Sequence, residues 1–167
     1  MVSMIQPGEA VPSVPVKHVS ASGASDVDSA ALLGEGRVVF FTVPGAFTPT
    51  CHKNHLPGFI DNAAAIKAKG VDRIVCGAVN DYHVVTAWAE ASNALGKIDF
   101  LSDGNGELAR AMGLEKDLSK AGMGDRFVRS ALLLRDGKVE AVYVEDAPGV
   151  TTSGAASILT ALEASQG

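Results

Sequence analysis

Cysteine is the scarce residue that matters most in this sequence, because the 167 residues contain only Cys51 and Cys76. Two cysteines are too few for the disulfide framework of a small secreted domain. In a reducing compartment such residues are more often reactive or metal-bound than structural. We therefore expect a cytoplasmic protein, and the two thiols are the first candidates for chemistry.

Basic runs and long apolar runs are also missing. The 14 Lys and Arg residues against 19 Asp and Glu residues give a formal charge of −5. No basic cluster offers a surface for nucleic acid. No apolar run reaches the roughly 18 residues of a membrane span, and the N-terminal residues lack the basic flank and apolar region of a signal peptide. We expect neither a nucleic-acid partner nor a membrane association.

A single domain spanning residues 1–167 is the simplest organisation, because the sequence shows no repeat, linker or low-complexity segment. Apolar runs typical of strands occur at 37–43, 71–79 and 97–103, and the first of these has the composition of a strand buried on both faces. An Asp-Gly pair in the middle of 129–144 predicts a β-hairpin there.

Helix signals separate these runs. Thr48 is a candidate N-cap before Pro49, and Gly70 is a candidate stop, with a kink or break expected at Pro57-Gly58. Further helices are expected from Asn80 or Asp81 to Gly96, over 107–112, and after a cap at Ser153. This order, closed by a hairpin, predicts the α/β class with a thioredoxin-like fold: a mixed central sheet with helices on both faces.

Cys51 follows the first of these strands and lies at the predicted helix start. If Thr48 is the N-cap, Cys51 is the third helical residue, where backbone N–H groups and the positive end of the helix dipole favour a thiolate. Pro44 and Gly45 form the strand-to-helix turn, which is where α/β folds place their sites. The alternative is that Cys51 only packs, since cysteine is among the most buried residue types.

The segment "PGAFTPTCHKNHLPGF" resembles the active-site segment of the peroxiredoxins, most closely the peroxiredoxin-5 or plant type II branch. Pro44, Thr48 and Cys51 match the signature Pro-x-x-x-Thr-x-x-Cys, and His55 to Phe59 match the pattern His-x-Pro-Gly-Phe that follows it. The likeness continues in "VDRIVCGAVNDYHVVTAWAEA" and "RSALLLRDGKV" and covers the chain from about Gly8 to Leu162.

The resemblance implies a thiol-dependent peroxidase that reduces hydrogen peroxide and small alkyl hydroperoxides without a cofactor. Cys51 would attack the peroxide and become a sulfenic acid. Thr48 would hold thiolate and peroxide, Pro44 would shield the sulfur, and backbone N–H groups near Gly45 and Cys51 would bind peroxide oxygen. The family's arginine corresponds to Arg129, which would stabilise the charge on the leaving oxygen.

Three expectations about Arg126 and the partner molecules accompany this resemblance. Arg126 is the alternative to Arg129, although its spacing to the hairpin is less suitable. The expected reductant is glutaredoxin with glutathione, or thioredoxin. A homodimer is expected because members of the family commonly pair through loops around the active site.

Cys76 leaves two alternatives open. It occupies the position at which plant type II relatives carry a second cysteine, so it could resolve the oxidised Cys51, whereas the position near the last helix used by other relatives is Thr152. Cys76 also lies in an apolar strand, where packing alone would select a small residue. Without an internal resolving thiol, an external thiol would attack the sulfenic acid.

Other kinds of site are weaker hypotheses. Cys51, His52 and His55 could be metal ligands, but a fourth ligand is missing, and we expect no metal. A cysteine hydrolase with His55 as base lacks an evident orienting residue. A catalytically silent thioredoxin-fold binding or chaperone module is the remaining alternative to an enzyme.

Overall fold

The computed structural model describes residues 3–50, 54–146 and 149–165. Within these residues the strands are β1 (Pro15–Ser20), β2 (Gly23–Asp28), β3 (Arg37–Val43), β4 (Arg73–Ala78), β5 (Asp99–Ser102), β6 (Glu115–Asp117), β7 (Asp125–Phe127), β8 (Ser130–Arg135) and β9 (Lys138–Val144). The helices are α1 (Ser29–Leu33), α2 (Leu56–Ala68), α3 (Tyr82–Ala91), α4 (Glu107–Ala111) and α5 (Ala155–Ser165), with a 3₁₀ turn, η2, at Ser119–Ala121. None of these helices is both long and apolar enough to cross a bilayer.

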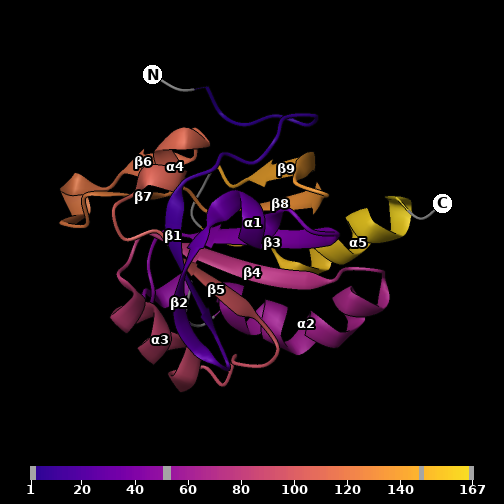
Figure 1. Ribbon diagram of the computed structural model, residues 1–167, viewed down its shortest axis with the longest axis horizontal. Coiled ribbons are helices and arrows are strands. Elements are labelled where there is room, and N and C mark those ends of the chain that lie inside the picture. The colour runs from indigo at the N-terminus through magenta and orange to yellow at the C-terminus, as the bar shows by residue number, and fades with distance from the viewer. Residues whose placement is uncertain (1–2, 51–53, 147–148, 166–167) are drawn as a thin grey trace.

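The main sheet runs in the order β2-β1-β5-β4-β3-β8-β9 (Figure 1). Strands β3, β4 and β5 are parallel, whereas β1, β2, β8 and β9 pair with antiparallel neighbours. A separate two-stranded ribbon consists of β6 and β7. The predicted mixed sheet is therefore confirmed, with β3, buried at every position, near its centre.

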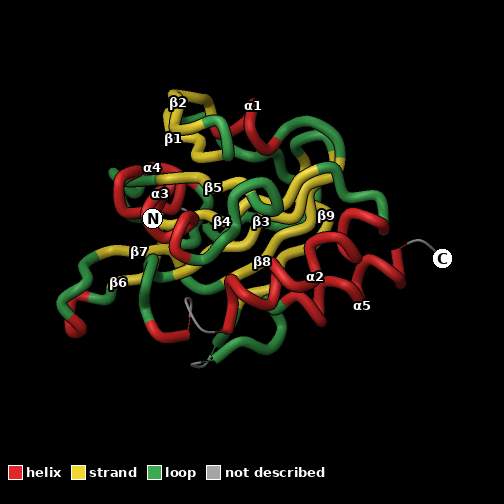
Figure 2. The backbone as a smooth tube through the Cα atoms, turned by 90° about the horizontal axis from the view of Figure 1, so that it is seen from below, coloured by secondary structure: helices red, strands yellow, loops and turns green. Residues whose placement is uncertain are grey.

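Helices cover both faces of the sheet, as predicted. One core contains apolar side chains from α2, α3 and α5, and the other contains side chains from α1 and α4. Figure 2 shows α2 and α5 side by side along one face of the sheet. Alternate residues of β4 divide between the two cores: Ile74 and Cys76 face the first, and Val75 faces the second.

Some predicted helix ends differ from those in the structure, because other residues than the predicted ones end or begin the helix. The helix after Asp81 ends at Ala91, since Asn93 adopts a left-handed φ of 55° and stops it before Gly96. Pro57 lies in the first turn of α2, which begins at Leu56 directly after a π-helical turn at 54–55, so the irregularity predicted at Pro57-Gly58 falls at the start of this helix. The Ser153 hydroxyl does not cap α5 but donates to Glu145.

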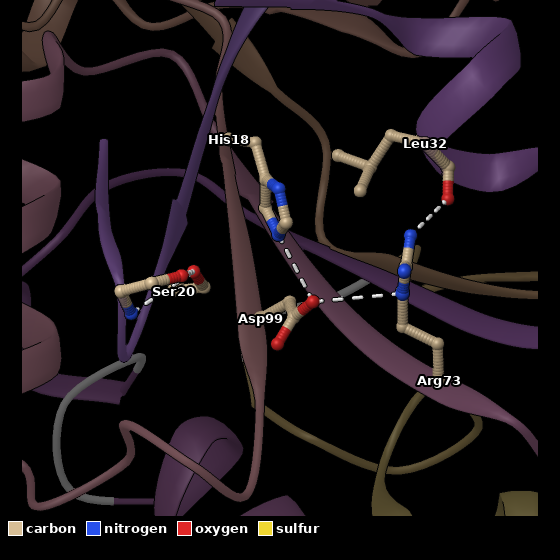
Figure 3. A network of polar contacts seen from close by, with 6 residues as sticks. His18, Ser20, Leu32, Arg73 and Asp99 are labelled. Carbon is tan, nitrogen blue, oxygen red and sulfur yellow. Dashed lines mark hydrogen bonds and ion pairs between the residues drawn. The ribbon is translucent and has the colours of Figure 1, made fainter. Parts of the chain in front are cut away.

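The N-terminal hairpin of β1 and β2 was not predicted, because β2 exposes most of its residues and lacks an apolar pattern. A polar network joins this hairpin to the rest of the sheet (Figure 3). The Nε2 atom of His18 lies 2.9 Å from the Asp99 carboxylate, and Arg73 contacts the same oxygen at 3.5 Å. Arg73 also donates to the Leu32 carbonyl at 2.9 Å, which connects β1, β4, β5 and α1.

Candidate active site

The loop of residues 44–48 leaves the carboxyl end of β3, beside the end of the parallel strand β4. Two hydrogen bonds fold it back on itself and onto the sheet. The Thr48 hydroxyl donates to the Gly45 carbonyl at 2.7 Å, and the Ala46 N–H donates to the Asn80 side-chain oxygen at 2.9 Å. The loop after β4 thus holds the loop after β3, at the edge where α/β sheets place their sites.

The predicted helix start is confirmed at Pro49 and Thr50, and Cys51 itself lies outside the described residues. Pro49 and Thr50 are helical, as expected after a cap at Thr48. Asn54 and His55 form a π-helical turn before α2, a departure from α geometry that is frequent at functional sites.

Both candidate arginines reach this loop. Arg126, in β7, donates from Nη1 to the Pro44 carbonyl at 3.3 Å and from Nε to the Met123 carbonyl at 2.8 Å. A Cβ at Gly45 would lie 3.0 Å from Nη1 of Arg126, a tight contact that the arginine side chain would have to relieve by shifting. Arg129 directly precedes β8 and, together with Pro44 and Thr50, lines a cavity of about 210 Å³.

His55 fixes one nitrogen of the Arg129 guanidinium. Nη1 of Arg129 donates to Nδ1 of His55 at 3.0 Å, and Nε2 of His55 donates to the Ser153 carbonyl at 3.0 Å. Burial first, and then the Arg129 charge, lower the pKa of His55 to about 4, against the opposing effect of the bond to Ser153. His55 is therefore neutral at pH 7, with the tautomer that can accept from Arg129.

Glu145 connects Arg129 to the segment that precedes α5. Its carboxylate accepts hydrogen bonds from the backbone N–H and the hydroxyl of both Thr151 and Ser153, at 2.6 to 2.8 Å. Burial would raise the pKa of Glu145, but these hydrogen bonds outweigh it and lower the pKa to about 2. The Glu145 N–H also donates to the Arg129 carbonyl at 3.0 Å. The segment before α5 is thereby attached to the residue that carries the guanidinium.

Contacts of the residues on either side of Arg129 also hold its backbone in place. The Thr42 hydroxyl donates to the Val128 carbonyl at 2.7 Å and lies 2.5 Å from the buried Ser130 hydroxyl. His55 rests against Phe41 and Phe59, whose rings stack with centroids 4.0 Å apart. Both neighbours of Arg129 in the chain and its histidine partner are thus held by buried contacts.

Cys76 lies in the middle of β4, opposite Phe41 of β3 and Phe100 of β5, with 1% of its surface exposed. Its strand ends at Ala78, close to the loop that follows β3. A disulfide needs Cα atoms within about 7 Å and an accessible thiol, so a resolving role requires β4 to open locally.

The alternative sites receive little support from the described residues. Among them, no three His, Cys, Asp or Glu side chains converge as metal ligands; Cys51 and His52 lie outside this set. Both ring nitrogens of His55 are already engaged by Arg129 and Ser153. A pKa of about 4 also makes His55 a poor general base near neutral pH.

Sequence reasoning did not identify Glu145, Ser153 or Asn80 as parts of this site. Each is a common surface residue type, and none belongs to the motif around Cys51. The one local signal was His55, a polar residue four positions before Phe59 on the buried side of a helix.

Comparisons with known proteins agree with this arrangement. The redoxin family matches residues 6–159. The chloroplastic Peroxiredoxin-2E-2 of Oryza sativa subsp. japonica is 46% identical over 97% of this chain and 74% of its own length. Peroxiredoxin-2B of Arabidopsis thaliana is 42% identical over 93% of this chain and 96% of its own. The structure of reduced Prx3 from Vibrio vulnificus in complex with H₂O₂ has a TM-score of 0.89 and 40% identity, covering 95% of this chain and 99% of that one.

These relatives are peroxiredoxins, the family that the segment around Cys51 resembles. The likeness extends over nearly the whole chain, includes the thioredoxin-like sheet, and accompanies a site in which Pro44, Thr50 and Arg129 line one cavity. The chain therefore belongs to the peroxiredoxin family.

Proposed function

We propose that this peroxiredoxin reduces hydrogen peroxide and small alkyl hydroperoxides with Cys51 as the reacting thiolate. The observation that carries this proposal is the cavity that Arg129 shares with Pro44 and Thr50, the residue directly before Cys51. A fixed cation beside a helix start favours a thiolate and stabilises negative charge that develops during the reaction.

The reaction divides into an oxidation and a reduction. The Cys51 thiolate attacks the terminal peroxide oxygen, an S–O bond forms and the O–O bond breaks. The leaving oxygen takes a proton and departs as water or an alcohol, while sulfur is oxidised to the sulfenic acid. A reducing thiol then attacks this sulfur, forms a mixed disulfide and releases water, and a second thiol restores Cys51.

The neighbouring residues have separable roles in the proposed oxidation. The Thr48 hydroxyl directs its hydrogen at the Gly45 carbonyl, so its oxygen can accept a hydrogen bond from the incoming peroxide. Pro44 lines the cavity without a backbone donor and limits access of water. Arg129, held by His55, faces the charge on the leaving oxygen.

An external thiol is the proposed reductant, either glutathione with glutaredoxin or thioredoxin. The burial of Cys76 supports this proposal, because a thiol within the central sheet is a poor partner for a sulfenic acid at the sheet edge. We further propose that the protein acts in a reducing compartment such as the cytoplasm, in which the external thiol is available. A fluorescent fusion confined to an oxidising compartment would contradict this location.

The experiment that tests the function is the intact mass of the reduced protein after one equivalent of hydrogen peroxide, with Cys51→Ser and Cys76→Ser as matched controls. Gain of one oxygen, absent in Cys51→Ser and retained in Cys76→Ser, is the expected result. Loss of two hydrogens that depends on both cysteines would assign the resolving role to Cys76. No rapid change in mass would indicate a silent thioredoxin-fold module.

A homodimer is the proposed assembly. Phe47, in the loop beside the site, leaves 48% of its surface exposed and has a left-handed φ of 62°, which is unusual for an aromatic residue. Burial of this ring against a second copy would offset that conformation. Sedimentation velocity should show a dimer that Phe47→Ser weakens, and a monomer at every working concentration would exclude the assembly.

A further inference from the structure

The β6–β7 ribbon places two cations side by side next to the candidate active site. Lys116 and Arg126 are direct partners in this antiparallel ladder. Directly opposed residues project from the same face, with Cβ atoms about 4.5 to 5.5 Å apart, and like charges at such a pair are destabilising. The Lys116–Arg126 pair therefore lowers the stability of the ribbon when no anion neutralises the two charges.

Both side chains of this pair point to the same loop. Arg126 donates to the Pro44 carbonyl at 3.3 Å, and Lys116 lines the cavity of about 210 Å³ together with Pro44, Thr50 and Arg129. A molecule whose reacting end lies beside Thr50 would therefore carry its other end past Lys116, whose direct neighbour in the ladder is Arg126.

The acidic residues of the ribbon project from its other face. Asp117 pairs with Asp125, and Glu115 pairs with Phe127, so these pairs flank the Lys116–Arg126 pair on either side. Because successive residues of a strand alternate between faces, the carboxylates lie opposite to the cations. The ribbon thus separates charge, with Lys116 and Arg126 on the face where Lys116 lines the cavity, and the carboxylates on the other face.

Charge compensation from nearby side chains is also missing for this pair. Over the described part of the chain, no carboxylate comes within ion-pair distance of Lys116 or Arg126. Glu145 lines the same cavity, but its oxygens already accept from Thr151 and Ser153. An incoming carboxylate would meet Lys116 and Arg129 in the cavity lining, with Arg126 beside Lys116 in the ladder, and one carboxylate that is already satisfied by hydrogen bonds.

We propose that Lys116 and Arg126 bind the carboxylate of a small substrate, so that the site favours hydroperoxides or reducing thiols that carry a carboxylate over their neutral counterparts. This inference rests on the proposed function and adds a substrate class to it. The two cations take no part in bond breaking: they hold the far end of the molecule while its peroxide or thiol end reacts at Cys51.

The test compares each acid with its ester, which removes the charge and keeps the reacting group. One arm measures oxidation of the reduced protein by 4-hydroperoxy-4-methylpentanoate and by its methyl ester. The other measures reduction of the sulfenic form by glutathione and by its diethyl ester. In at least one of the two arms, which we call the responsive arm, the acid should react faster than its ester. In this arm Lys116→Gln should lower the acid-to-ester rate ratio about three- to tenfold, and added salt should lower the ratio as well.

Lys120→Gln is the matched control, because Lys120 is an exposed lysine four residues further along, on η2. Lys116→Gln should also melt at the same or a higher temperature, since it removes a like-charge pair.

The responsive arm identifies whether the carboxylate belongs to the oxidant or to the thiol. Equal rates for acid and ester in both arms, or an equal effect of Lys120→Gln, overturn the inference. Rapid reaction with hydrogen peroxide in the same preparation shows that the proposed function stands regardless, whereas no reaction overturns both.

Discussion

At the scale of single residues, burial decides what His55 can do. Its ring is 1% exposed, touches Phe41 and Phe59, and bridges Arg129 to the Ser153 carbonyl. A protonated ring could not accept from a guanidinium, and burial keeps the ring neutral. The residue is thus suited to orient Arg129 and unsuited to exchange protons at neutral pH.

Replacing His55 by Leu should therefore slow oxidation of the protein by hydrogen peroxide. We expect a loss of about 10- to 100-fold in the second-order rate constant, because a guanidinium without its acceptor is displaced from the reacting atoms. Stopped-flow measurement should show that His55→Gln, whose amide oxygen can accept, recovers part of the rate. His83→Leu, at an exposed position of α3, is the control. Equal rates for His55→Leu and the control would show that Arg129 needs no such support.

At the scale of elements, β4 shows why a strand can require glycine. Gly77 lies opposite Thr42 in the ladder with β3, and a Cβ at Gly77 would lie 2.7 Å from two atoms of the Phe40 ring. Phe40 is fully buried and packs edge-on against Phe127, so the ring cannot move away without disturbing the second core.

Substituting Gly77 by Ala should destabilise the fold by about 1 to 3 kcal/mol through overpacking. Urea unfolding followed by circular dichroism measures this effect. Gly104→Ala is the matched control, because its added Cβ would meet no atom closer than 3.6 Å. A Gly77→Ala protein as stable as this control would mean that the Phe40 ring has room to shift.

At the scale of the whole molecule, the buried network makes stability depend on pH. The pKa of His55 falls to about 4 on folding from an ordinary value near 6.5, so the unfolded chain binds more protons between these values. The contribution of His55 to stability is therefore complete above pH 6.5 and falls as the pH drops towards 4. The pKa of Glu145 is lowered to about 2 from 4.5, so its contribution is complete above pH 4.5 and is lost as the pH falls through about 2.

Acidification from pH 7 to pH 4 should thus lower the free energy of unfolding by about 3 kcal/mol through His55 alone. Urea titrations across this range measure the slope, and His55→Gln should flatten it between pH 6.5 and pH 4. His83→Gln should retain the slope of the parent protein. A parent protein whose stability is constant over this interval would show that folding does not lower the pKa of His55.

Local patterns predicted much of the fold because their signals lie within a few residues. The Val- and Phe-rich run became β3, Asp81 caps α3 through the His83 and Val84 N–H groups, and the Asp136-Gly137 pair turns β8 into β9. Strands whose stability comes from a neighbour were missed. β2 and the β6–β7 ribbon have short or exposed sequences, and only their partners in the ladder define them.

The sequence by itself determined the fold class, the helix start around Cys51, and the family, since these depend on motifs that are contiguous in the chain. Tertiary structure alone decided which distant side chains meet there. Arg129 reaches His55 across 74 positions, Ser153 reaches His55 across 98, and Lys116 faces Arg126 through a ladder that no local pattern indicated. The physical reason is that burial and hydrogen bonding act on positions in space, and folding alone brings such separated residues together.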